Sequence, residues 1–500
     1  MTALDVLRAG GNAVDAAVAT AAVLCLTEPH MTGIGGDCFV LLGLPNGEVK
    51  GLNGSGRSSM AADAAWLKRS GLAAIEPGSP HAVTVPGAID AWDVLLKAHG
   101  TMDLAEALKP AIRLAETGVS VTPRVAWDWA GDTELLTADE GARLHLLAHG
   151  RAPKAGEIMR YPALAQTLKR IAAEGRDAFY LGAIAEDIVQ VLQAKGSLLA
   201  REDFARHRGE WVTPIATQFH GAEILEIPPN GQGLTALIGL NVLSRFDLER
   251  LQPGSAELLH LQAEALKLAW VYRNRHIADP DFADIPVEDL LSAKTADMLA
   301  QMIRPDRALE LPQVPDPRSD TVYFTVVDGE RMACSFINSL YHGFGSGIVT
   351  PRTGITLQNR GAGFVTTSGH PNCIGPGKRP LHTIIPAMAR EQGKVTLSFG
   401  VKGGDYQPMG HMAVATARFA HGLTLQAAID APRVFPQNGG LTVERGVPPQ
   451  VCAALQAMGH RLTPAVEPLG GGQAIAIDRS LGTLEGGSDP RKDGLALGYD

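Results

Sequence analysis

The sequence has little of what defines several large classes of protein. Its five cysteines are scattered over 500 residues without CxxC or CxxH spacing, so we expect reduced thiols rather than a disulfide framework or a zinc site. No apolar stretch is long enough to span a membrane, and no basic tract accompanies the net charge of −9, which argues against a nucleic-acid partner. HExxH, EF-hand and Walker-type motifs are missing, so the sequence predicts no metal and no cofactor.

The composition that remains is that of an ordinary globular chain with a large core, 45% hydrophobic and 19% charged. The apolar run 16–26 follows Gly10-Gly11-Asn12 instead of a basic leader, so it predicts a buried helix rather than a signal peptide. Because the first residues already have a helical pattern, the true start could lie upstream. We expect a cytoplasmic protein, with a periplasmic one as the alternative if the start is truncated.

Hydrophobic periodicity alternates between helical and strand patterns along the chain. Glycine-rich turns recur beside the predicted strand ends, where they permit tight packing or bring backbone amides near a site. The pattern predicts helices over 2–9 and 13–26, and strands over 38–44, 211–219, 222–227 and 355–359.

One stretch in the second half suggests chemistry. A proline-rich segment, 305–319, leads into a strand that begins at Thr321, and Asp328-Gly329 then turns the chain into a second strand, 331–339. A threonine in this place is usually only a β-former. The alternative is that the chain cleaves itself before Thr321, whose freed α-amino group would then serve as the base for its own hydroxyl.

Several stretches together resemble the γ-glutamyltransferase family of N-terminal-nucleophile (Ntn) hydrolases, over nearly the whole chain. The matching motifs are Ala3–Ala17, Gly33–Asp37, Asp320-Thr321, Phe344–Gly347, Lys378–Leu381, Gly403-Gly404 and Asp489–Arg491. The resemblance implies an α+β protein, an Ntn-hydrolase αββα four-layer sandwich made as a proenzyme. Cleavage between Asp320 and Thr321 would give a large subunit, 1–320, and a small one, 321–500, which stay together as a heterodimer in one fold. Further dimerisation is left open.

The same resemblance implies the catalytic roles. Thr321 would attack an amide carbonyl and form an acyl-enzyme, Gly403 and Gly404 would donate backbone N–H groups to the oxyanion, and Ser339 would steady the new N-terminus. The implied substrate-binding residues are Arg57, Tyr341, Asn359, Arg360, His382, Thr383 and Asp405. Position alone also allows Arg57 to be an ordinary surface arginine.

The departures from the family pattern concern the substrate. Gly363 stands where the γ-glutamyl members have the acidic residue that holds an α-ammonium, Arg360 lies nearby, and His382-Thr383 replace paired serines. This pattern resembles the divergent, oxamate amidohydrolase-like branch and predicts hydrolysis of a small acidic amide, because an unpaired ammonium would be disfavoured there. The alternatives are γ-glutamyl transfer or glutathione hydrolysis with Asp405 as the ammonium partner, and an unprocessed binding protein on the same fold.

Overall fold

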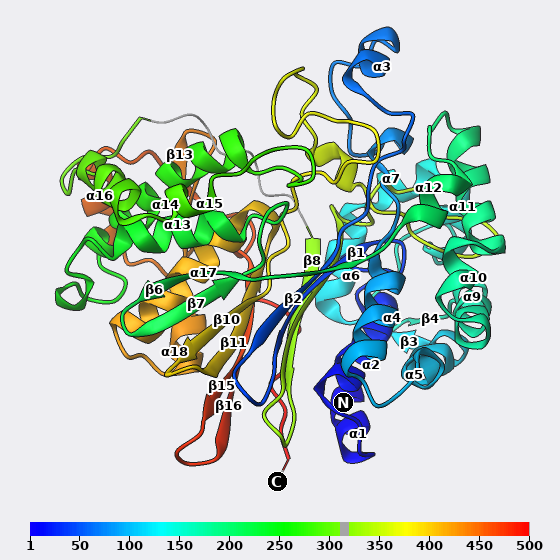
Figure 1. Cartoon of the computed structure of the whole chain (residues 1–500), viewed down its shortest axis with the longest axis horizontal. Coiled ribbons are helices and arrows are strands. Elements are labelled where there is room, and N and C mark those ends of the chain that lie inside the picture. Colours follow the sequence, from blue (N-terminus) through cyan, green and yellow to red (C-terminus); the bar gives the residue numbers. More distant parts are fainter. Residues whose placement is uncertain (311–319, 500) are drawn as a thin grey trace.

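Two antiparallel sheets lie face to face at the centre of the molecule in this computed structural model, which describes residues 1–310 and 320–499 (Figure 1). Most of the proline-rich segment expected over 305–319 therefore lies outside the described residues. The first sheet contains, in spatial order, β5 (Glu210–Val212), β2 (Val49–Gly54), β1 (Asp37–Gly43), β9 (Ala333–Tyr341) and β8 (Asp320–Val327). The second contains β16 (Thr483–Ser488), β15 (Gly471–Asp478), β11 (Lys394–Lys402), β10 (Ala387–Glu391), β7 (Ala222–Glu226) and β6 (Ile215–Phe219).

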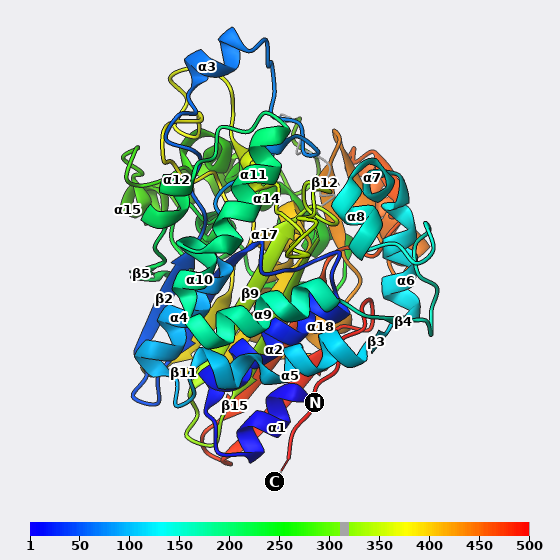
Figure 2. The ribbon, with the colours of Figure 1, turned by 90° about the vertical axis from the view of Figure 1, so that its right-hand side faces the viewer.

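Helices cover the outer face of each sheet, on the right and left of Figure 1, and Figure 2 shows those of the right-hand layer stacked across their sheet. The helices that share a hydrophobic core with the first sheet are α1 (Thr2–Arg8), α2 (Ala13–Thr27), α4 (Ala88–His99), α5 (Leu104–Thr117), α9 (Pro162–Glu174), α10 (Arg176–Tyr180) and α11 (Ala183–Ala194). Those that share a core with the second are α13 (Gly233–Leu243), α14 (Ala256–His276), α16 (Ala293–Met302), α17 (Gln407–Ala415), α18 (Leu425–Asp430) and α19 (Pro449–Ala457).

Shorter elements complete the chain around these layers. The short helices are α3 (Ala64–Arg69), α6 (Pro123–Gly131), α7 (Thr133–Ala138), α8 (Glu140–His145), α12 (Arg201–Arg206) and α15 (Val287–Leu290). The minor strands are β3 (Val119–Ser120), β4 (Ile158–Met159), β12 (Val434–Gln437), β13 (Gly440–Val443) and β14 (Leu462–Pro464). Among the described residues, no helix combines the length and apolar character needed to cross a bilayer.

The period of two along each strand divides the core into three layers. On β1, Val40 and Leu42 face the helices of the first layer, whereas Phe39 and Leu41 lie between the sheets. Tyr323 on β8 also lies between the sheets. A helical cluster, an inter-sheet cluster and a second helical cluster follow one another, which confirms the αββα four-layer sandwich.

Both sheets combine strands from the two halves of the chain. Strand β1 pairs with β9 along its whole length, from Asp37↔Ser339 to Gly43↔Ala333. Strand β7 pairs with β10 in the second sheet. The residues on either side of position 320 therefore share one core rather than forming two separate units.

Local signals explain the start of α2, the helix that faces β8. Asn12 and Asp15 form a reciprocal capping box at the start of α2. The Asp328 carboxylate, at the β8–β9 turn, accepts a hydrogen bond of 3.0 Å from the Ala13 N–H, where the helix dipole favours an anion. The predicted helices over 2–9 and 13–26 and the strand over 38–44 are confirmed to within a residue or two.

The strand predicted over 355–359 is wrong. Residues there make only isolated bridges, Val349↔Thr356 and Gly35↔Leu357. A tight turn precedes them, because Gly354 has a φ of 68° and its N–H bonds to the Thr350 carbonyl at 2.8 Å. The apolar alternation of this segment reflects burial against neighbouring loops rather than a continuous ladder.

Candidate active site

Thr321 lies at an irregularity in the β8–β9 ladder. Asp320 pairs with Tyr341 and Val322 with Asn338, so Thr321 alone opposes two residues of β9. Bulges of this kind re-aim a side chain and are frequent beside active sites. The Thr321 side chain is buried, and its Oγ1 lies 3.0 Å from Oγ of Ser339. The hairpin thus brings Thr321 next to Ser339, the residue that the family resemblance expected to steady the new N-terminus.

Ser339 connects the candidate nucleophile to a buried cation. Its Oγ accepts hydrogen bonds from the Tyr341 backbone N–H at 2.8 Å and from Nη2 of Arg360 at 3.3 Å. Tyr341, the last residue of β9, has a φ of 84°, a conformation that few non-glycine residues adopt. The strand end is therefore bent so that its backbone amide turns back onto Ser339.

The glycine turn before β1 packs directly against this strand end. A Cβ atom on Gly36 would lie only 2.3 Å from the carbonyl oxygen of Ser339, and one on Gly35 would lie 2.2 Å from that of Thr356. These two glycines are required for the close approach of three backbone segments. Their role is structural, because the backbone around them leaves no room for a side chain.

Arg360 occupies the centre of the predicted substrate-binding group. It begins the short 3₁₀ turn Arg360–Gly363, and its side chain is fully buried. Nη1 donates to Oγ1 of Thr383 at 2.8 Å, and the guanidinium lies 4.0 Å from the centre of the Tyr341 ring. Nε has no hydrogen-bond partner among the described residues. The guanidinium is thus held by two hydroxyls and a ring face.

No carboxylate of the described chain lies within ion-pair distance of Arg360. Burial lowers the pKa of Arg360 to about 10, although the charges of Asp37 and Asp405 and the Tyr341 hydroxyl partly offset that effect. The side chain therefore remains cationic at neutral pH. A buried cation without a paired anion is costly, so an anionic ligand beside it would be favoured.

His382 is held by Asp37 and carries no charge at neutral pH. Its Nε2 lies 3.0 Å from Oδ2 of Asp37, and the Ile384 backbone N–H donates to Nδ1, so the Nε2–H tautomer donates to the carboxylate. Burial, together with the positive charge of Arg360, lowers the pKa of His382 to about 4. His382 therefore donates a hydrogen bond to Asp37 and does not place a second positive charge beside Arg360.

Asp37 is the member of this cluster that the sequence did not single out. Its Oδ1 accepts hydrogen bonds from Gly56 N at 3.0 Å, Gly87 N at 3.2 Å and Nε2 of Gln358 at 2.9 Å. Asp37 belongs to the predicted glycine motif, but its partners come from distant loops. Only the fold reveals it as the group that joins these loops to His382.

Gly403 and Gly404 lie where β11 ends and a short 3₁₀ turn leads into α17. Their φ angles are 129° and 53°, which disfavours other residues. Gln232 connects this turn to the Arg360 group, because Nε2 donates to the carbonyls of Thr383 at 2.7 Å and Gly404 at 2.9 Å. A continuous set of hydrogen bonds therefore runs from Thr321 through Arg360 and Thr383 to the glycine pair.

Asp405 is engaged by an arginine of α14. Its Oδ1 accepts from Nη2 of Arg273 at 2.7 Å, and Nε of Arg273 donates to Oε1 of Gln232 at 2.9 Å. Neither Gln232 nor Arg273 was predicted from the sequence, because nothing in their local pattern marks them. Arg273 neutralises the charge of Asp405, and Gln232 connects Arg273 to the turn that carries Gly403 and Gly404.

Two predicted residues make most of their contacts elsewhere. Nδ2 of Asn359 donates to the Pro77 carbonyl at 3.1 Å, and its Oδ1 accepts from the His342 N–H at 3.2 Å, so Asn359 joins loops behind Arg360. Arg57 contacts Asp281 at 2.7 Å, Asp279 at 3.1 Å and Glu210 at 3.2 Å. The described contacts of Arg57 do not link it to the Thr321 group.

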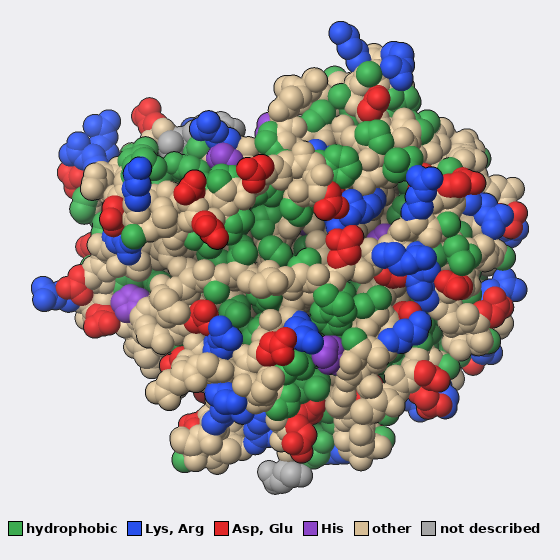
Figure 3. All heavy atoms as spheres, viewed as in Figure 1, with side chains coloured by type: hydrophobic (Ala, Val, Ile, Leu, Met, Phe, Trp, Pro, Cys, Tyr) green, Lys and Arg blue, Asp and Glu red, His purple; other side chains and the backbone are tan. Residues whose placement is uncertain are grey.

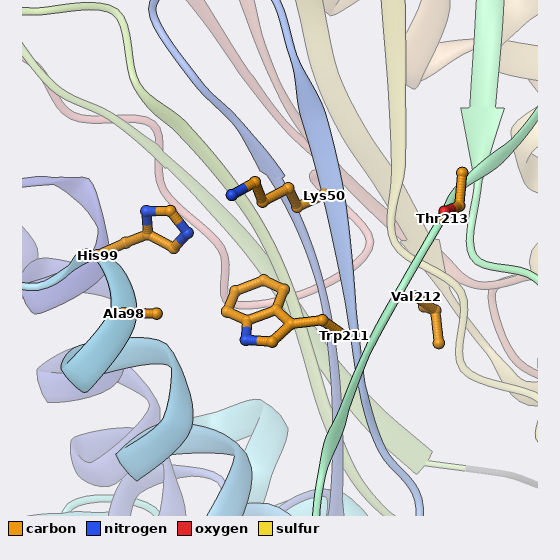
Figure 4. A pocket seen from close by; sticks show the side chains of 6 residues that line it. All are labelled: Lys50, Ala98, His99, Trp211, Val212 and Thr213. Atoms are coloured by element: carbon orange, nitrogen blue, oxygen red, sulfur yellow. The ribbon is translucent and has the colours of Figure 1, made fainter.

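A surface hollow of about 420 Å³ lies apart from these residues, between α4 and the β2–β5 edge (Figure 4). Lys50, His99 and Trp211 converge on it, and Lys50 also approaches Glu48 at 3.8 Å. It includes none of the predicted site residues. Charged groups of both signs are interspersed on the face seen in Figure 3.

The four-layer sandwich, with a buried threonine at the head of a strand, defines the class of Ntn hydrolases. Comparison with known proteins then identifies the family. The profile of the family described as Gamma-glutamyltranspeptidase matches residues 1–499. The chain belongs to this family, and it is an enzyme, a self-processing Ntn hydrolase.

Individual relatives cover nearly the full length. The chain is 39% identical to a glutathione hydrolase-like YwrD proenzyme of Bacillus subtilis over 99% of this chain and 95% of that one. It is 35% identical to an oxamate amidohydrolase proenzyme of Klebsiella pneumoniae over 100% and 96%. A crystal structure of cephalosporin acylase from Bacillus halodurans superposes with a TM-score of 0.94 at 39% identity, covering 100% of this chain and 94% of that one.

Proposed function

We propose that the chain cleaves itself between Asp320 and Thr321, and that the mature enzyme hydrolyses the amide bond of a small acid whose carboxylate binds Arg360. The observation that carries the substrate assignment is the buried, cationic Arg360, which has no carboxylate partner in residues 1–310 and 320–499 and lies one hydroxyl away from Thr321. The relatives alone do not decide the substrate, since they are named as a glutathione hydrolase-like protein, an oxamate amidohydrolase and a cephalosporin acylase.

Processing would begin with the Thr321 hydroxyl. Attack of Oγ1 on the Asp320 carbonyl forms an ester and breaks the peptide bond, whose nitrogen takes up the hydroxyl proton. Water then hydrolyses the ester and leaves the Asp320 carboxylate and a free Thr321 with its α-amino group. The hydrogen bond between Thr321 Oγ1 and Ser339 Oγ supports this step because it fixes the hydroxyl at the ladder irregularity.

In the mature enzyme the Thr321 α-amine would take the proton of its own hydroxyl as Oγ1 attacks the substrate amide. The acyl-enzyme forms, the amine leaves with the transferred proton, and water releases the acid. Gly403 and Gly404 would donate backbone N–H groups to the oxyanion, an interaction worth about 3–4 kcal/mol when one such donor is removed. Their positive φ angles support this role, because such backbones can direct amides into a site.

The substrate carboxylate would pair with Arg360, and the hydroxyl of Thr383 would keep the guanidinium in place. The ring of Tyr341 lies against the guanidinium. Burial raises the pKa of the Tyr341 hydroxyl, so this side chain stays neutral and does not supply the anion that Arg360 lacks. A substrate ammonium would be repelled by Arg360. Asp405, the ammonium partner that γ-glutamyl chemistry would need, is already paired with Arg273.

The experiment is a substrate panel on the processed enzyme. Oxamate, other small amide acids, glutathione and a γ-glutamyl anilide are compared with ethyl oxamate, in which the carboxylate is esterified. We expect hydrolysis of at least one small amide acid and a loss of about a hundredfold or more in kcat/KM on esterification, as for removal of a buried charge partner. Glutathione as the preferred substrate would establish γ-glutamyl chemistry instead. An uncut, inactive chain would contradict the proposed cleavage between Asp320 and Thr321.

A further inference from the structure

A second buried group of titratable side chains lies outside the proposed catalytic machinery. His260 and Glu264 are one turn apart on α14, and His460 reaches them from the loop before β14. All three side chains are buried, and within the described residues theirs are the only His, Cys, Asp or Glu side chains that converge as metal ligands would. His260 and His460 are 200 positions apart, which explains why no sequence motif announces them.

The three donor atoms have the spacing of a metal site. Nδ1 of His260 lies 2.8 Å from Nε2 of His460, and Oε1 of Glu264 lies 4.0 Å and 3.8 Å from these two nitrogens. The point equidistant from the three atoms is therefore about 2.1 Å from each, which matches Zn–N and Zn–O bond lengths. A tetrahedral ion would require the two imidazole nitrogens to separate to about 3.3 Å and the Glu264 oxygen to approach each of them to about the same distance.

The outer contacts also have the pattern found around metal ligands. Nε2 of His260 lies 2.7 Å from the Arg304 carbonyl, so it must donate, which leaves Nδ1 with its lone pair directed at the cluster. Glu264 binds the Leu309 N–H at 2.9 Å through Oε2, which leaves Oε1 as the donor facing the two histidines. Outer hydrogen bonds of this kind fix the tautomer and orientation of metal ligands.

We propose that His260, Glu264 and His460 bind one divalent metal ion of the zinc type, with a fourth position for water. Two imidazoles and one carboxylate are ligands that Zn²⁺ accepts. The ion would replace the His260–His460 hydrogen bond, and His460 would coordinate through Nε2 with its proton on Nδ1. Arg304 and Leu309 make hydrogen bonds to His260 and Glu264. The ion would therefore also hold the chain around residues 304–309 in place.

Lys267 is the competitor for this position. Its ammonium lies 2.6 Å from Oε1 of Glu264, the same oxygen that would bind the ion, and 2.9 Å from the Leu309 carbonyl. On metal binding the ammonium retains the carbonyl as its acceptor and gives up the carboxylate. Repulsion between two cations lowers the affinity, so removing the ammonium should strengthen metal binding while removing a ligand should abolish it.

The test titrates Zn²⁺ alone into chelator-treated, full-length protein and measures binding by competition with a chromophoric chelator, together with Tm. Wild type, Glu264→Gln, His460→Gln and Lys267→Met are compared with His220→Asn. His220 is the matched control because it also contacts a carboxylate, Glu249 at 3.2 Å, but at the surface. Circular dichroism identifies any variant that fails to fold.

We expect one equivalent bound by wild type and His220→Asn, at least a hundredfold weaker binding by Glu264→Gln and His460→Gln, and about tenfold tighter binding by Lys267→Met. Zn²⁺ should raise Tm only where it binds. No stoichiometric binding by either wild type or Lys267→Met, or binding unchanged in Glu264→Gln, would overturn the proposal. None of these readouts depends on catalytic activity, so the result is independent of the proposed function.

Discussion

Arg57 and Arg360 present the same guanidinium in opposite surroundings. Arg57 is partly exposed and contacts the carboxylates of Asp279, Asp281 and Glu210. Burial alone would lower its pKa, but the hydrogen bond to Asp281 and the charges of the three carboxylates raise it. Arg360 is fully buried among hydroxyls and a ring, and burial lowers its pKa to about 10.

The difference shows which arginine is available to a ligand. The charge of Arg57 is neutralised by the protein itself, so a substrate carboxylate would have to displace acidic side chains. The charge of Arg360 is uncompensated at short range, so a small anion would provide its missing partner. Four predictions would break or sharpen this comparison, and they are ordered from the largest expected effect to the smallest.

The first asks whether chemistry takes place beside Arg360 at all. Thr321→Ala removes the hydroxyl, so we expect no cleavage and no amide hydrolysis, measured by denaturing gel, intact mass and turnover. Thr325→Ala is the matched control, because Thr325 lies on the same strand and also bonds a serine, Ser398 at 2.6 Å. A cleaved Thr321→Ala protein would contradict the assignment and move the search to another part of the molecule.

The second removes the uncompensated cation. Arg360→Gln should lower kcat/KM for the acidic amide by about 10²–10³-fold, or about 3–4 kcal/mol, mainly through KM, because the substrate carboxylate loses its partner in a dry site. Arg360→Lys should recover only part of this, since a lysine cannot reproduce the contacts to both Ser339 and Thr383. Equal kcat/KM for wild type and Arg360→Gln would eliminate Arg360 as the anion receptor.

The third prediction concerns the pH dependence of stability that is due to His382, the neutral neighbour of Arg360. The pKa of His382 is lowered to about 4 in the folded protein, so the unfolded chain binds more protons between the usual value near 6.5 and 4. Stability should therefore fall as pH decreases through this window, by at most about 3 kcal/mol. His382→Gln should make the acid-induced loss in the free energy of unfolding less steep. If the free energy of unfolding, measured by denaturant titration at each pH, falls equally steeply in wild type and His382→Gln, then His382 does not contribute to the acid-induced loss of stability.

The smallest effect is expected at Arg57. Because its ion pairs are partly exposed and screened, Arg57→Gln should cost about 1 kcal/mol of stability and change kcat/KM by no more than a few fold. Denaturant unfolding and the same substrate assay provide the measurement. A loss in kcat/KM comparable to that of Arg360→Gln would reverse the roles of the two arginines.

The sequence predicted the parts of the site that depend on local geometry. The turn at Asp328-Gly329 predicted the hairpin that holds Thr321, the family resemblance implied the role of Ser339 beside it, and the glycine pair at 403–404 could be placed at a strand end. The environment of Arg360 could be predicted only in part. The sequence placed Arg360 near the substrate, but its separation from carboxylates depends on how distant loops pack.

The remaining site residues follow from long-range contacts that no local pattern reveals. Asp37 meets His382 across the first sheet and the following loops, and Arg273 and Gln232 reach the glycine turn from other elements. The strand predicted over 355–359 failed for the same reason, since alternation reports burial and not the presence of a partner strand.

The interleaving of strands from both halves has a consequence for the lifetime of the processed enzyme. While the peptide at position 320 is intact, β1 finds β9 within one chain, and refolding after denaturation is a first-order event. After cleavage the same pairing joins two molecules, so refolding becomes second order in concentration, and separated fragments at low concentration compete with aggregation. A denatured sample of the processed form would therefore recover less completely as it is diluted, whereas recovery of the uncut precursor would not depend on dilution in this way.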